Sequence, residues 1–296
     1  MRRSTDRILT THVGSLPRPD ALIEVMIAQD KGEIIDEAAF ETKLKNAVGE
    51  VVKKQVELCV DVVDDGEFSK RGFAVYAHER LGGLEPTGKA RPSPWADSRE
   101  SRAFPEFYAP EKTAGDKKPT PSTMQMACTA PLTYKGQALL ERDLGNLRAA
   151  AAANGVKEAF VPAISCSDIA GNQVNQHYGS DDDFLYAIAD AMNVEYRAIV
   201  DAGFLLQIDD PRLINYYVKN PQLSVDECRA WAETQVEAIN HSLKGIPEDR
   251  VRYHTCYGIN MGPRVHDMEM KDFIDIVLKI NAGAYSFEAA NQRHEH

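Results

Sequence analysis

Short apolar runs alternate with longer amphipathic stretches along this chain. Seven short runs rich in β-branched and aromatic residues predict strands at residues 8–13, 60–63, 123–128, 159–164, 205–208, 252–257 and 285–287. The intervening segments are mostly long enough for a helical crossover, so the strands are expected to run parallel. The pattern therefore predicts an α/β fold in which helices wrap a parallel sheet.

Three stretches carry clear helix signals. Apolar residues recur at helical spacing across residues 36–58. Ser180 precedes three consecutive aspartates, and negative charge in a first turn is favourable to the helix dipole. Ser224 and Glu227 have the spacing of a capping box, and Gly245 is expected to end the helix that they begin.

One long segment, residues 82–122, is rich in proline, glycine and charge and has no clear period. Such a stretch inside a compact domain is usually a lid, a hairpin excursion or a disordered loop, and we favour a lid over the functional site. No internal repeat, low-complexity tract or linker divides the chain. The sequence therefore predicts a single domain over residues 1–296.

The number of strands suggests a specific architecture. Seven strands are one short of a closed (β/α)8 TIM barrel. The chain ends eight residues after Glu288, and unpaired strand edges would remain where the eighth strand belongs. We therefore expect a TIM barrel that is C-terminally truncated before its eighth strand.

Composition and charge narrow the class of partner. A net charge of −11 and a pI near 5.3 disfavour nucleic acid and anionic membranes, because both would repel the protein at long range. The N-terminus has basic residues but no apolar stretch behind them, and no run of uncharged apolar residues is long enough to span a bilayer. Five scattered cysteines suit a reducing compartment. We expect a cytoplasmic protein that acts on small molecules; its oligomeric state stays open.

The most informative chemical feature is the pair His254 and Cys256 on the predicted strand 252–257. Side chains two residues apart on a strand share one face, so both can reach a single metal ion. Glu288 follows the next predicted strand and adds a carboxylate, which completes a plausible set of zinc ligands. The H-x-C motif alone is weak, since a buried histidine beside a buried cysteine has the same pattern.

Polar residues also follow the other predicted strands. They are Gly14 and Ser15, Asp65 and Glu67, Thr129, Ser165 and Cys166, and Asp209 and Asp210. In α/β barrels the reacting groups lie at these carboxyl ends of the strands. Structural alternatives remain for individual residues: Glu67 and Asp65 can cap a turn or pair with Lys70 and Arg71, and Asp209 can form a turn. His12 is expected to be a packing or hydrogen-bonding residue.

As an ordered set, five segments resemble the catalytic barrel of cobalamin-independent methionine synthase and of its relatives, the epoxyalkane:coenzyme M transferases. These segments are Thr10–Pro19, Asp64–Phe68, Gln207–Pro211, His254–Tyr257 and Phe287–Glu288. The likeness implies a zinc-dependent enzyme on a TIM barrel. It runs in order from residue 8 to residue 290, and this order makes it specific.

The resemblance assigns roles position by position. His254 and Cys256 match the first two zinc ligands, and Glu288, 32 residues after the cysteine, matches the glutamate ligand at a spacing longer than the family's usual one. Gly14, Ser15 and Glu67 match positions that hold the amino acid end of homocysteine, and Asp209 matches the carboxylate that pairs with its ammonium. The family's fourth ligand, a cysteine on the eighth strand, has no counterpart here, nor does the histidine that follows it.

The sequence thus predicts a zinc-dependent thiol methyl- or alkyltransferase. The simplest version transfers a methyl group from a folate-type donor to homocysteine and gives methionine; the alternative alkylates another thiol, as the epoxyalkane:coenzyme M transferases do. Zn²⁺ would lower the pKa of the bound thiol so that thiolate exists at neutral pH. Two further hypotheses are a metal-free decarboxylase on the same scaffold, for which H-x-C has no use, and a non-catalytic barrel with a structural metal.

Overall fold

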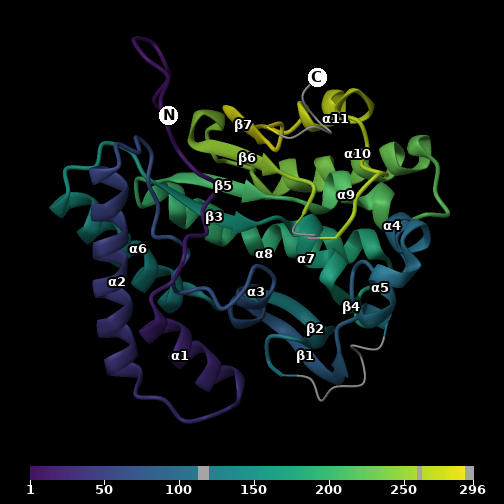
Figure 1. Ribbon diagram of the computed structural model, residues 1–296, viewed down its shortest axis with the longest axis horizontal. Coiled ribbons are helices and arrows are strands. Elements are labelled where there is room, and N and C mark those ends of the chain that lie inside the picture. Colours follow the sequence, from purple (N-terminus) through teal and green to yellow (C-terminus); the bar gives the residue numbers. More distant parts are fainter. Residues whose placement is uncertain (113–119, 259–261, 291–296) are drawn as a thin grey trace.

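The centre of the molecule is a parallel four-stranded sheet. The computed structural model describes residues 1–112, 120–258 and 262–290. Within it, strands β3 (Phe160–Ile164), β5 (Leu205–Asp209), β6 (Val251–Thr255) and β7 (Ala284–Phe287) pair in the order β3-β5-β6-β7 (Figure 1). The sequence patterns at 159–164, 205–208, 252–257 and 285–287 are therefore confirmed as strands.

The first two predicted strands are reduced to isolated bridges. Thr11 bridges Val62 and Val63 bridges Ala159, both in the parallel sense, so the line of parallel neighbours reaches β3 from the N-terminal segment. The Phe160 amide donates to the Val63 carbonyl at 2.9 Å. The strand pairing of the N-terminal segment ends soon after Thr11 because the chain turns at Gly14, which has a φ of +131°.

The prediction that residues 123–128 belong to the central sheet is wrong. Strand β2 (Met124–Tyr134) pairs antiparallel with β1 (Leu81–Ala90) and parallel with β4 (Gln173–Asn175), and the three form a separate sheet. In Figure 1 helices α7 and α8 lie between the two sheets. Among the described residues, therefore, the parallel strands do not close into a barrel, and the fold is mixed α/β with two sheets.

The segment expected to be an irregular lid has regular structure. It contains β1 and two short helices, α4 (Arg99–Ala103) and α5 (Pro105–Lys112). Two glycines at residues 82–83, Pro86 and Gly88 interrupt the apolar alternation of β1 and hid the strand from sequence analysis. Part of the predicted lid, residues 113–119, lies outside the described residues.

Helices cover both faces of the central sheet. Besides α4 and α5, they are α1 (Asp20–Asp30), α2 (Glu37–Glu57), α3 (Val75–Arg80), α6 (Gln137–Ala153), α7 (Cys166–Asn172), α8 (Asp181–Asp201), α9 (Arg212–Lys219), α10 (Val225–Ser242) and α11 (Ile274–Val277), with the 3₁₀ turns η2 (Glu248–Arg250) and η3 (Met270–Asp272). The capping predictions are confirmed, because Ser180 caps α8 and Ser224 with Glu227 forms a capping box on α10. Helix α10 ends at Ser242, slightly before Gly245.

Helix α8 shows why the core forms where it does. Phe184, Ile188, Met192 and Ile199 recur at helical spacing and are all buried. This face contacts both β5 and β2, so one amphipathic helix joins the two sheets into a common core. In the described part of the chain, no helix is long and apolar enough to cross a membrane.

Candidate active site

The carboxyl ends of β5, β6 and β7 bring three polar side chains into one row. Asp209 pairs with His254, and His254 pairs with Ser286, in the parallel register of the sheet. Paired residues of neighbouring strands point to the same face and lie about 4.8 Å apart across the sheet. Cys256 and Glu288 lie two residues beyond His254 and Ser286, at the same edge.

Two of the three expected metal ligands, His254 and Glu288, have a local contact. The Nδ1 atom of His254 lies 3.2 Å from the Ser286 hydroxyl, and the Tyr257 amide donates to Glu288 Oε2 at 3.1 Å. Burial lowers the pKa of His254, which favours the neutral imidazole. Burial also raises the pKa of the Cys256 thiol to about 11. The unliganded site therefore holds a neutral imidazole and a protonated thiol.

The fit of these residues to a metal ion is mixed. With Nδ1 engaged by Ser286, Nε2 is the ring nitrogen available to a metal, which is how a neighbouring polar group usually orients a histidine ligand. Nitrogen, sulfur and carboxylate oxygen are also the donors that zinc prefers. However, nowhere in residues 1–112, 120–258 and 262–290 do three histidine, cysteine or acidic side chains gather closely enough to hold an ion. The zinc site thus stays a prediction.

A second group of side chains surrounds Gly14 beside this row. A Cβ atom at Gly14 would lie 2.8 Å from Glu67 Oε1 and 2.8 Å from the ring of Pro162, so only glycine lets the three approach. Glu67 itself has a φ of +57°, an unusual conformation for a residue with a side chain. The turn that follows Val63 therefore holds the Glu67 carboxylate against the first segment of the sheet.

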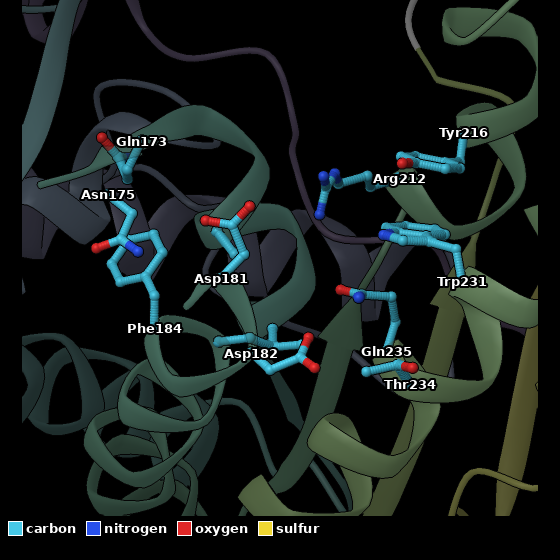
Figure 2. A pocket seen from close by; sticks show the side chains of 12 residues that line it. Gln173, Asn175, Asp181, Asp182, Phe184, Arg212, Tyr216, Trp231, Thr234 and Gln235 are labelled. Carbon is cyan, nitrogen blue, oxygen red and sulfur yellow. The ribbon is translucent and has the colours of Figure 1, made fainter. Parts of the chain in front are cut away.

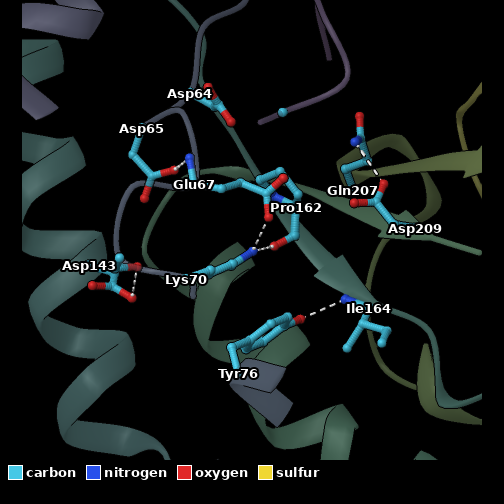
Figure 3. A network of polar contacts seen from close by, with 12 residues as sticks. Asp64, Asp65, Glu67, Lys70, Tyr76, Asp143, Pro162, Ile164, Gln207 and Asp209 are labelled. Carbon is cyan, nitrogen blue, oxygen red and sulfur yellow. Dashed lines mark hydrogen bonds and ion pairs between the residues drawn. The ribbon is translucent and has the colours of Figure 1, made fainter. Parts of the chain in front are cut away.

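Lys70 neutralises this group from below (Figure 3). Its Nζ donates to Glu67 Oε2 at 3.1 Å and to the Pro162 carbonyl at 2.5 Å, and it lies 4.6 Å from the centre of the Tyr76 ring. Burial disfavours the charged amine, but the charges of Glu67 and its neighbours outweigh burial and raise the pKa of Lys70. The interpretation that Glu67 pairs with Lys70 is confirmed, and it does not remove Glu67 from the site.

Asp209 is held by a single amide. The Gln207 Nε2 atom donates to Asp209 Oδ1 at 2.8 Å and to the Val13 carbonyl at 2.7 Å, which ties β5 to the Gly14 turn. Burial, followed by repulsion from Glu67, raises the pKa of Asp209 well above its usual value. The Glu67 and Asp209 carboxyl groups thus face a common space. The positive charge near them does not fully compensate their negative charge.

Comparisons with known proteins match this arrangement to one family. The family model "Cobalamin-independent synthase, Catalytic domain" matches residues 8–139, which include Gly14, Ser15 and Glu67. The chain is 25% identical over 272 residues to a methionine synthase of Sulfolobus acidocaldarius, an alignment that covers 91% of this chain and 68% of the relative. The chain is thus similar to cobalamin-independent methionine synthases, and the family model covers its first half.

More distant members match in part. A 5-methyltetrahydropteroyltriglutamate--homocysteine methyltransferase of Thermotoga petrophila is 24% identical over 97% of this chain, but the chain spans only 33% of that relative. Two solved structures share the fold with a TM-score of 0.60: a B12-independent methionine synthase from Shewanella sp. W3-18-1 in complex with selenomethionine, at 18% identity with 84% of this chain and 61% of that chain covered, and the putative vitamin-B12 independent methionine synthase from Listeria monocytogenes, at 20% identity with 86% and 67% covered.

The residues expected from the family motif do not all meet. Gly14, Glu67 and Asp209 lie together, but Ser15 is exposed, and within the described residues no hydrogen bond of its hydroxyl is found. Its assignment to the substrate carboxylate stays a prediction. His12 bonds Gln55 at 2.7 Å, as a hydrogen-bonding residue should.

Three residues of the site carried little sequence signal. Lys70 was noted only as a salt-bridge partner, and neither Gln207 nor Ser286 drew attention. Gln207 and Ser286 lie two residues before Asp209 and Glu288, so strand periodicity places each on the same face as a residue already singled out. That spacing was the signal available for them.

A buried carboxyl group near the site gives a pH prediction. Asp210 is fully buried, and burial followed by repulsion from Asp168 raises its pKa to about 7. The folded protein therefore keeps a proton that the unfolded chain loses near pH 4, and the associated stability is present at low pH and is lost as the pH rises toward about 7. In Asp210→Asn the free energy of unfolding should therefore decrease less steeply with pH over this range, by about 1.4 kcal/mol per pH unit. Urea unfolding between about pH 5 and about pH 7 measures this.

The exposed residue Asp226 on α10 provides the matched control. Asp226→Asn should leave the pH dependence of unfolding unchanged. If the free energy of unfolding of wild type and of Asp210→Asn depended on pH in the same way, the assignment of a protonated Asp210 would be contradicted.

Proposed function

We propose that this chain is a zinc-dependent thiol S-methyltransferase that transfers a methyl group from a folate-type donor to homocysteine, giving methionine. The observation that carries the proposal is the row Asp209, His254 and Ser286 across three neighbouring strands. It sets a carboxylate suited to a substrate ammonium directly beside the imidazole of the H-x-C pair. A substrate anchored at one end would present its thiol at the other.

The acidic space between Glu67 and Asp209 is suited to an ammonium group. Burial and repulsion from Glu67 raise the pKa of Asp209 and favour its protonated form, against the opposing charges of Lys70 and Arg252. A substrate ammonium would reverse this balance and release the proton. Binding of an amino acid thiol should therefore strengthen as the pH rises toward neutrality.

His254, Cys256 and Glu288 would hold Zn²⁺, which supplies a Lewis acid that makes a bound thiol acidic at neutral pH. The contributions of the chain itself are positional. Ser286 fixes the ring of His254, and the Tyr257 amide orients the Glu288 carboxylate. His254, Cys256 and Glu288 are partly buried, which would limit hydration of the sulfur nucleophile during in-line attack on the methyl group.

The donor is proposed from the relatives. The name of the Thermotoga petrophila relative includes 5-methyltetrahydropteroyltriglutamate, but that protein is about three times as long as the matched region. Because the chain spans a third of it, alkylation of another thiol, with an epoxide as electrophile and coenzyme M as acceptor, is the second candidate. The described cysteines are all free, which suits work in a reducing cytoplasm.

One assay separates the two candidates. Zinc-loaded protein is incubated with L-homocysteine and 5-methyltetrahydrofolate, or with 2-mercaptoethanesulfonate and epoxypropane, and products are measured by mass spectrometry. Asp209→Asn should raise KM for homocysteine by about 10- to 100-fold, because it removes a charge-assisted contact to the ammonium. KM for 2-mercaptoethanesulfonate, which has no ammonium, should not rise.

The outcomes are distinct. Methionine formation supports methyl transfer, and formation of an alkylated sulfonate supports the second candidate. Absence of product with every pair would overturn a transferase function. If Asp209→Asn raised KM equally for both thiols, only the proposed ammonium contact would be refuted, and the transferase function would stand.

A further inference from the structure

A cavity of about 320 Å³ is lined by none of the residues in the row Asp209, His254 and Ser286; Figure 2 shows the side chains around it. Elements β4, α7, α8, α9 and α10 surround it. Figure 2 shows Arg212, Trp231 and Gln235 on one side of the cavity and Asp181 and Asp182 on the other. Nothing in the proposed transfer reaction uses these residues.

The two sides carry opposite charge. Asp181 and Asp182 belong to the first turn of α8, where they also favour the helix dipole. The Arg212 guanidinium extends from α9 toward them, and its NH1 group donates to the Ser167 carbonyl at 2.9 Å. In the described part of the chain no carboxylate oxygen lies within ion-pair distance of Arg212. Asp168 and Asp210, which do not line the cavity, act most strongly on the charge of Arg212, and Asp181 acts on it from the cavity wall.

A buried acceptor also borders the cavity without a partner. Gln235 is 5% exposed, and its Oε1 atom makes no hydrogen bond in the structure as described. Leaving such a buried oxygen without a hydrogen bond is unfavourable. The amide end of Gln235 points into the cavity in Figure 2, so a ligand with a polar N–H group would satisfy it.

The position of Arg212 depends on the absence of a side chain at residue 171. A Cβ atom at Gly171 would collide with the Nε, Cζ and Cδ atoms of Arg212, so the arginine lies directly against the α7 backbone. Its guanidinium carbon is 4.8 Å from the centre of the Trp231 ring, which is itself stacked on Tyr216 at 3.5 Å. Arg212 is therefore held in a defined orientation at the cavity wall.

The apolar part of the lining limits the ligand further. Phe184 and Leu185 are buried residues of α8 that border the cavity together with the indole of Trp231. A free phosphate or nucleotide would meet two repelling carboxylates, and a simple cation would meet Arg212. A molecule that carries both charges and an apolar side chain matches each wall.

We propose that this cavity is a second ligand site that binds a free apolar α-amino acid. The α-carboxylate would contact Arg212, the ammonium would contact Asp181 or Asp182 and the Gln235 oxygen, and the side chain would lie along Trp231 and Phe184. A guanidinium and a carboxylate facing each other are the usual partners of the two ends of an amino acid. The site is separate from the one at Asp209 and does not depend on its proposed function.

Trp231 makes the proposal directly measurable. The chain has two tryptophans, so Trp95→Phe leaves Trp231 as the only fluorescent indole. Titration with L-leucine, L-methionine or L-phenylalanine should change Trp231 fluorescence saturably with a Kd of about 1 mM or below. Isothermal titration calorimetry on the unmodified chain provides a second readout. N-acetyl-L-phenylalanine lacks the ammonium and L-phenylalaninol lacks the carboxylate, so both should bind at least about tenfold more weakly.

Three variants test the contacts. Arg212→Gln should weaken binding by about tenfold or more. Gln235→Met keeps the side-chain length and removes an unsatisfied acceptor, so the protein should remain as stable as wild type while binding is lost. Gly171→Ala displaces Arg212 without changing the chemistry of the lining, and it should also weaken binding. Asp209→Asn removes the ammonium contact proposed for the other site, and this variant should bind the amino acids normally.

The results decide the proposal clearly. Saturable binding that Gln235→Met and Arg212→Gln weaken and Asp209→Asn retains would support it. Absence of saturable binding in both readouts would overturn it, and so would binding that survives both cavity variants. Loss of binding in Asp209→Asn alone would place the amino acid at the proposed transferase site instead.

Discussion

Replacing Cys256 by serine is expected to abolish thiol alkylation, with a loss of about 1000-fold or more, equivalent to about 4 kcal/mol of transition-state stabilisation. The reason is that a serine hydroxyl does not ionise to replace a thiolate ligand, and zinc prefers sulfur or nitrogen to a neutral hydroxyl. Zinc bound per chain should fall in parallel. Metal content after dialysis, measured by mass spectrometry, is independent of any catalytic assay.

Cys59→Ser is the matched control, because Cys59 is an exposed free cysteine outside the site. It should leave zinc content and transfer unchanged. If Cys256→Ser keeps both the metal and the activity, the proposed role of the H-x-C pair is wrong. If Cys256→Ser keeps the metal but loses transfer, the Cys256 thiol takes part in the reaction without binding zinc.

The second large effect is expected at Lys70. Lys70→Met should lower the free energy of unfolding by about 3–5 kcal/mol, because it leaves buried carboxyl groups without their cation. Lys70 is 6% exposed and contacts Glu67 and the Pro162 carbonyl, while Asp65 and Asp209 lie in the same electrostatic environment. Methionine has a side chain of similar size without the charge, so the loss reports charge rather than packing. Urea unfolding at neutral pH measures it.

Two controls make the result specific to charge. Lys45→Met, at an exposed position of α2, should change stability by no more than about 0.5 kcal/mol. Adding Glu67→Gln to Lys70→Met should restore part of the loss, since it removes the charge that the lysine neutralises. The difference from wild type should also shrink as the pH falls and the carboxyl groups take up protons. A loss below about 1 kcal/mol would show that Lys70 is not needed to compensate buried charge.

The strands that precede Cys256 and Glu288 agree with the sequence prediction, because β6 and β7 pair in the expected parallel sense. Metal binding by His254, Cys256 and Glu288 stays a prediction. By contrast, residues 123–128 have strand composition but pair with β1 in a separate sheet. Local composition specifies an extended backbone; it does not specify the partner strand.

Sequence by itself determined the helices with strong caps, the four strands of the central sheet and the acidic and metal-binding residue types at their ends. These features depend on side-chain periodicity and on hydrogen bonds between residues three apart, which are local. Only the tertiary structure decided that Lys70 reaches the Pro162 carbonyl, that Gln207 ties Asp209 to the Gly14 turn and that a charged cavity forms around Arg212. Each of these joins residues from distant parts of the chain, and burial, which sets their pKa values, exists only once the chain has folded.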